Sequence, residues 1–154
     1  MTDAAIAVRN RSGRAVDLSR PAALARLVFA ELRLSSRCAL SITYVDLAEM
    51  ERLHLEHMDE PGATDVLSFP MDELRAPADN EPSPSGELGD IVICPEFAQQ
   101  QAATAGHPLE EELDLLLVHG ILHLLGHDHL EPEEHALMFG LQEQLLSQWK
   151  AGAK

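Results

Sequence analysis

The segment that most constrains the fold is residues 108–125, PLEEELDLLLVHGILHLL, which is acidic at its start and then apolar on every side of a helix. Glutamates in the first turn suit the positive end of a helix dipole. A helix that is apolar all round is normally buried inside a protein. The sequence therefore predicts a central buried helix that carries its histidines into an enclosed site.

Three histidines at the end of this helix have the spacing of metal ligands. His119 and His123 are four residues apart, so both imidazoles leave the same helix face one turn apart. Gly126 can end the helix in the left-handed conformation, and His129 then returns toward the same point. Buried imidazoles need partners, and a shared cation provides one. We predict a metal site with an open coordination position for water.

The identity of the metal and the class of reaction are left open by spacing alone. Zinc suits three imidazoles and a water, although other transition metals bind the same ligands. The spacing H-x3-H-x2-G-x2-H is that of metzincin proteases, in which a glutamate follows the first histidine. Here that position is Gly120. A zinc hydrolase of peptides stays an alternative, but it lacks its usual general base.

The other histidines and the cysteines are given structural interpretations. His54, His57, His107 and His135 are predicted to be hydrogen-bonded core residues, and His127 to support the site or face solvent. Cys38 and Cys94 are far apart and have no partner at ligand spacing. We expect two buried free thiols.

Composition restricts the size of the fold and the way in which it meets a partner. A chain of 154 residues that is 45% hydrophobic suits one domain, 1–154. Its net charge of -15 excludes bulk attraction to a phosphate backbone. Basic residues cluster before residue 40, where they either form a local basic face or lie as solvated helix arginines: Arg9, Arg11, Arg14, Arg20, Arg26, Arg33 and Arg37.

Periodicity predicts an α+β fold with about four strands and about five helices. Strands are expected at residues 6–10, 39–45, 65–69 and 88–94, with the last two paired. Helices are expected from a cap at Ser19, from a capping box at Asp46, and over residues 95–105, 108–125 and 132–149. The proline-rich segment between the third and fourth strands is predicted to be a mobile loop. No signal segment or long apolar run is present, so we expect a cytoplasmic protein that does not enter a membrane.

Three sequence blocks together resemble one family. HGILHLLGHDH, with TDVLSFP at residues 64–70 and LGDIVICP at residues 88–95, is similar to the YbeY family of bacterial metal-dependent endoribonucleases. The resemblance runs from about Asp46 to the last helix. It implies a small mixed sheet, one zinc ion on His119, His123 and His129, and cleavage of single-stranded RNA.

The resemblance also implies a role in the cell. It suggests maturation of the 16S rRNA 3′ end and ribosome quality control, with ribosomal components and the GTPase Era as partners. A non-catalytic ribosome-assembly factor with a structural metal is the further alternative. It is disfavoured because structural zinc usually has four ligands.

The catalytic residues are less well defined than the metal ligands. Asp128 is a weak candidate for the general base, since orienting a ligand is a commoner task for such a carboxylate. Asp65, Ser68 and Asp90 lie in blocks typical of the family but have ordinary structural explanations. Met58 stands where the family commonly has an arginine, so the cation that contacts phosphate is undefined, and an N-terminal arginine is one substitute.

Overall fold

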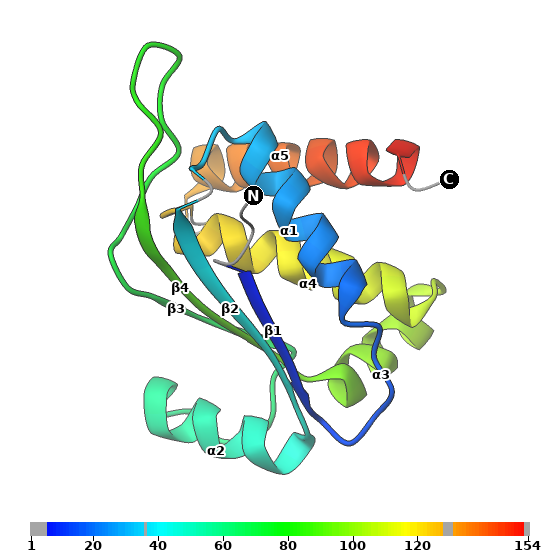
Figure 1. Ribbon diagram of the computed structural model, residues 1–154. Helices are drawn as coiled ribbons and strands as arrows, with labels where there is room; N and C mark the ends of the chain where they lie inside the picture. The colour runs from blue at the N-terminus through cyan, green and yellow to red at the C-terminus, as the bar shows by residue number, and fades with distance from the viewer. Residues whose placement is uncertain (1–5, 36, 128–130, 153–154) are drawn as a thin grey trace.

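The structure is a computed structural model that describes residues 6–35, 37–127 and 131–152. Its elements follow the predicted order (Figure 1): β1 (Ile6–Arg11), α1 (Ser19–Glu31), β2 (Cys38–Val45), α2 (Leu47–Met58), β3 (Val66–Pro70), β4 (Gly86–Ile93), α3 (Pro95–Ala105), α4 (Leu109–Leu124) and α5 (Pro132–Gly152). The predicted α+β class, with four strands and five helices in the described ranges, is confirmed. No helix within those ranges is long and apolar enough to cross a membrane.

The four strands form one mixed sheet in the order β1-β2-β4-β3. β1 and β4 each pair with β2 in parallel. β3 pairs with β4, as predicted, and runs antiparallel to it, with Ser68 opposite Ile91. β3 is therefore an edge strand, and one of its sides is available to line a site.

Helix α4 is the centre of the molecule. It packs against β3 and β4 on one side and is covered by α1, α3 and α5, whereas α2 lies across the opposite face of the sheet (Figure 1). Leu116, Leu117, Val118, Ile121 and Leu122 are all buried. The apolar sequence of this helix thus has the predicted physical cause, since its surroundings are core on nearly every side.

Of the two predicted helix caps, the one at the start of α2 is confirmed and the one at the start of α1 is not. The Asp46 carboxylate accepts a hydrogen bond from the Glu49 backbone N–H at 2.8 Å, as the capping box requires. At α1 the prediction is wrong, because Ser19 is the first helical residue rather than the cap. Asp17 instead accepts from the Ser19 backbone N–H and hydroxyl, at 3.0 and 2.6 Å.

Helix α4 ends in the predicted glycine turn. Gly126 has φ +94°, in the left-handed region that only glycine adopts freely. Its N–H donates to His123 O at 2.9 Å, and the His127 N–H donates to Leu122 O at 3.0 Å. This pair of bonds is a Schellman motif, and it brings the His127 backbone back alongside the last turn of the helix.

The segment between β3 and β4 is tied to the end of α1. Arg33 donates to Ala78 O at 2.7 Å and to Glu81 O at 3.2 Å. The expectation of a wholly mobile loop therefore overlooked these anchoring contacts. The two cysteines, Cys38 and Cys94, are buried free thiols, as predicted.

Candidate metal centre

His119 and His123 meet beside the edge strand β3. They leave the same face of α4, and their Nε2 atoms are 3.0 Å apart. The ring centroids are 4.5 Å apart, with 81° between the ring planes. The helical spacing of the two residues therefore brings two imidazole nitrogens to one point, as predicted.

Each ring is oriented through its other nitrogen. His119 Nδ1 lies 2.9 Å from Gln142 Oε1 on α5, and His123 Nδ1 lies 3.0 Å from the backbone oxygen of His127. A carbonyl oxygen only accepts, so each Nδ1 carries a proton, and in the neutral form of such a ring the lone pair is at Nε2. Gln142 is only 6% exposed, which makes its side chain a fixed support.

This geometry fits a bound cation. With both protons on Nδ1, the two Nε2 lone pairs converge on one point, and a transition-metal ion would accept both. Imidazole ligands whose second nitrogen donates to an oxygen are the usual arrangement around zinc. His129 and the weak base candidate Asp128 lie outside the described residues. Within the residues that are described, no group of three His, Cys, Asp or Glu side chains is placed to hold a metal.

The two histidines line a cleft of about 390 Å³ between α4, the outer side of β3 and the end of α2. The cleft contains one carboxylate among its described residues, that of Asp65, and its remaining lining is largely apolar or neutral: Met58, Val66, Leu67, Ser68 and Pro70. A cavity of this size accommodates a nucleotide-sized segment of a substrate.

Asp65, Ser68 and Asp90, the three polar residues of the family-like blocks, do not lie in one site. Asp65 lines the cleft, and its carboxylate accepts from the Val66 N–H at 2.7 Å and from the Thr64 hydroxyl at 3.2 Å. The Ser68 hydroxyl donates to Gly120 O at 3.3 Å, linking β3 to α4. Asp90 lines a different cavity, under α2, and does not line the histidine cleft.

Gly120 is required by close packing between α4 and the sheet. A β-carbon at this position would lie 3.2 Å from Cδ1 and Cγ2 of Ile91 and 3.2 Å from Ser68 Oγ. A side chain here would force these two neighbouring side chains to shift. The position that carries the catalytic glutamate in metzincins is therefore crowded in this chain.

The structure places the N-terminal arginines away from the histidine cleft. Met58 lines the cleft, but none of the seven arginines does. Arg9 and Arg11 lie in the cavity under α2, whereas Arg14 and Arg20 line a cavity at the other end of α4. Of the two alternatives for these arginines, a basic face beside the site is wrong, because β1 and α1 direct their arginines to different sides of the molecule.

Arg75 is the cation near the site that the sequence did not reveal. Its guanidinium lies so close to Gly126 that a β-carbon there would overlap it. Burial lowers the pKa of His127, and the positive charge of Arg75 lowers that pKa further. Because Arg75 lies in the loop after β3, no periodicity in the sequence links it to the histidines.

The remaining histidines divide into two groups. His54 bonds Gly62 O and Glu60 Oε1 at 2.9 Å each, and His107 Nε2 lies 2.6 Å from Glu112 Oε1, so the hydrogen-bonded prediction is confirmed for both. His57 and His135 are exposed, and the core prediction is wrong for them. They lie against phenylalanine rings, at centroid distances of 5.0 Å from Phe69 and 4.4 Å from Phe139.

Comparisons with known proteins agree with one another. The family model Endoribonuclease YbeY matches residues 8–150. A protein of Paenarthrobacter aurescens named Endoribonuclease YbeY is 55% identical over 144 residues, which are 94% of this chain and 92% of the relative. A protein of the same name from Beutenbergia cavernae is 57% identical and covers 94% of this chain and 97% of its own length.

A solved structure shows the same fold. The solution structure of a Thermotoga maritima protein superposes with a TM-score of 0.60 at 22% identity, covering 95% of this chain and 92% of that chain. At that identity the likeness concerns the fold alone. The family match and the identities to its members show that the chain belongs to the Endoribonuclease YbeY family.

Proposed function

We propose that this chain is a zinc-dependent endoribonuclease that cuts single-stranded RNA, with one ion held by His119, His123 and His129. Membership of the family makes it a hydrolase of RNA phosphodiester bonds. The observation that carries the zinc proposal is the convergence of the Nε2 atoms of His119 and His123 at 3.0 Å, with both Nδ1 atoms engaged by oxygens. Open zinc sites with three protein ligands are typical of hydrolases.

The chain's own residues have separate tasks in this proposal. Gln142 and the His127 carbonyl hold the imidazoles in the required tautomer. When bound, zinc supplies a Lewis acid for a phosphate oxygen and a water of lowered pKa. Arg75 provides a guanidinium for a phosphate at the open end of the α4 turn. Asp65 in the cleft and Asp128 beside His129 are the carboxylates available to accept a proton.

The site favours RNA over peptide. A peptidase of the metzincin type needs a carboxylate after its first histidine, and this chain has Gly120 there, at a position crowded by Ile91 and Ser68. The peptide alternative thus loses its base.

Sequence recognition is expected to depend on partners. No phenylalanine, tyrosine or tryptophan lines the described part of the histidine cleft, so bases have no aromatic surface on which to stack there. We therefore propose that ribosomal components and an Era-like GTPase position the RNA. The place of action would be 16S rRNA 3′-end maturation and ribosome quality control in the cytoplasm.

One comparison tests the proposal in cells and in solution. RNA from cells that carry His119→Ala should accumulate unprocessed 16S 3′ ends, whereas cells with His57→Ala, a histidine outside the cleft, should not. Purified protein should cut a single-stranded RNA and leave an unstructured peptide intact. Normal 16S ends in His119→Ala cells, or peptide cleavage that requires His119, would contradict the proposal.

A further inference from the structure

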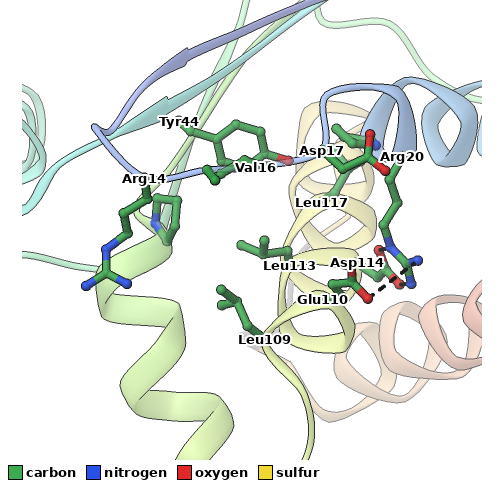
Figure 2. A pocket seen from close by; sticks show the side chains of 13 residues that line it. Arg14, Val16, Asp17, Arg20, Tyr44, Leu109, Glu110, Leu113, Asp114 and Leu117 are labelled. Carbon is green, nitrogen blue, oxygen red and sulfur yellow. Dashed lines mark hydrogen bonds and ion pairs between the residues drawn. The ribbon is translucent and has the colours of Figure 1, made fainter.

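A second cavity of about 360 Å³ lies at the other end of α4, away from the histidines (Figure 2). Its apolar walls come from the segment before α1 and from the first half of α4: Val16, Leu109, Leu113 and Leu117, together with Pro21 and Pro95. The volume is in the range of pockets that hold small organic molecules.

The roof of this cavity carries a tyrosine hydroxyl that opens onto it. Tyr44 on β2 is only 2% exposed. Figure 2 shows its ring along the cavity with the hydroxyl directed toward Asp17 and Leu117. No group among the described residues exchanges a hydrogen bond with that hydroxyl. The hydroxyl therefore faces the open space of the cavity, where the acceptor of an occupant can pair with it.

One part of the polar wall is held in place by its own contacts. Arg20 donates to both carboxylate oxygens of Asp114, at 3.0 and 2.6 Å, and Trp149 Nε1 donates to Asp114 at 3.0 Å. The Arg20 guanidinium also lies 5.6 Å from the centre of the Trp149 ring. Arg20 and Asp114 are thus engaged with one another, whereas the Tyr44 hydroxyl is open to an occupant.

The charges near the hydroxyl select against anions. Burial raises the pKa of Tyr44, and the carboxylates of Asp114 and Asp17 raise it further because they place negative charge near the hydroxyl. Arg14 and Arg20 lie on opposite sides of the cavity in Figure 2, and Arg20 is neutralised by Asp114. A phosphate group is thus disfavoured beside Tyr44, which separates this cavity from RNA binding.

We propose that this cavity is a binding site for a small uncharged molecule with a rigid apolar body and one hydrogen-bond acceptor, such as a carbonyl oxygen or ring nitrogen, that pairs with the Tyr44 hydroxyl. The apolar body fills the space between Leu109, Leu113 and Leu117. The site is independent of the proposed metal chemistry and would stand if that chemistry were disproved.

A matched pair of probes tests the site on the full-length protein. 1-Indanone and indane share one two-ring skeleton, and only the first has a carbonyl. Trp149 is the single tryptophan of the chain, and its indole N–H donates to Asp114 of the cavity wall, so it gives one assignable signal next to the cavity in a nitrogen–proton NMR spectrum. Titration with 1-indanone should shift this signal and those of the α4 amides near Leu113 in a saturable manner.

Two variants separate the hydrogen bond from the apolar contact. Tyr44→Phe should weaken binding of 1-indanone about three- to tenfold, the effect of one neutral hydrogen bond, and leave indane unchanged. Leu113→Phe, which fills the cavity, should abolish the shifts from both probes. The absence of saturable shifts in the unsubstituted protein, or equal binding of 1-indanone to Tyr44→Phe, would overturn the proposal.

Discussion

The Nε2 atoms of His119 and His123 lie 3.0 Å apart, while the Nδ1 atom of each ring contacts an oxygen from a different segment of the chain. One oxygen belongs to Gln142 on α5 and the other to the backbone of His127 after the Gly126 turn. The ring positions are therefore set by tertiary structure as well as by helical spacing. This relationship leads to the first prediction.

Replacing Gln142 should weaken metal binding without removing a ligand. Gln142→Leu leaves His119 Nδ1–H without its acceptor, and loss of such a support typically lowers metal affinity about 10–100-fold. Gln142→Glu retains an acceptor and should restore affinity. Zinc competition with a chromophoric chelator measures both variants, with the exposed Gln144→Leu on the same helix as control. Equal zinc affinity in Gln142→Leu and Gln144→Leu would show that Gln142 has no such role.

Two helical glycines provide a matched test of packing at the site. Alanine at Gly120 meets Ile91 and Ser68 at 3.2 Å, whereas alanine at Gly140 on α5 meets nothing within 4 Å. Both substitutions gain the same helix propensity. The difference between their free energies of unfolding therefore reports the cost of overpacking at Gly120, which is about 1–3 kcal/mol. Urea unfolding should find Gly120→Ala less stable than Gly140→Ala by that amount. Equal free energies of unfolding for the two variants would contradict this prediction, because they would mean that α4 and its neighbours accommodate the added methyl group without cost.

Arg75 should contribute to RNA binding. Arg75→Ala removes the cation beside Gly126 and should raise KM for a single-stranded RNA severalfold, with a smaller effect on kcat. Arg9→Ala removes the same charge on the other face of the sheet, where it cannot reach the cleft, and should leave KM unchanged. Steady-state cleavage assays measure both variants. If the two substitutions raised KM equally, the effect would be one of net charge alone.

The purified protein should cut naked RNA with little sequence preference. The cleft lacks an aromatic stacking surface in its described part, so unrelated single strands of equal length should be cleaved at slow and similar rates. Gel analysis of end-labelled RNAs makes this comparison. Rapid cleavage at one site of a naked RNA would contradict the assignment of specificity to partners.

Alkaline pH should destabilise the protein through Tyr44. Its pKa is raised by burial and by Asp114 and Asp17, so the folded state holds the phenolic proton more tightly than the unfolded state does. The resulting stability is complete below the ordinary tyrosine pKa of ~10 and is lost as pH rises through that value toward the folded pKa. Free energies of unfolding should fall more steeply above this pH than they do for Tyr44→Phe.

The titration of the chain's single tyrosine can be followed directly by its ultraviolet absorbance. In the folded protein the tyrosinate signal should appear at higher pH than in urea. Titration of the folded protein at the ordinary tyrosine pKa would contradict the buried environment of Tyr44.

The sequence was sufficient for features that depend on local pattern. The alternation in residues 39–45, the Asp46 capping box and the glycine after α4 each have a local physical cause, and the structure has all three. The pairing of His119 with His123 also follows from helical spacing. Such features do not depend on which segments meet in the folded chain.

Features that depend on the meeting of distant segments were missed. Gln142 reaches His119 from another helix, and Arg75 approaches Gly126 from a loop. The arginines of β1 and α1 lie on different sides of the molecule. Their positions depend on how the strands are ordered in the sheet and on where α1 packs, which the sequence pattern does not give. Ser19 was predicted to cap α1, but its backbone N–H and hydroxyl both donate to the carboxylate of Asp17, two residues earlier.

The most direct test of the central claim is the metal content of protein purified without an affinity tag. Elemental analysis should find close to one zinc per chain in the unsubstituted protein and in His57→Ala, and almost none in His119→Ala, His123→Ala or His129→Ala. Circular dichroism of the same samples should show that the substituted chains remain folded. Unsubstituted protein without stoichiometric metal, or a folded His123→Ala chain that retains it, would contradict the proposed site.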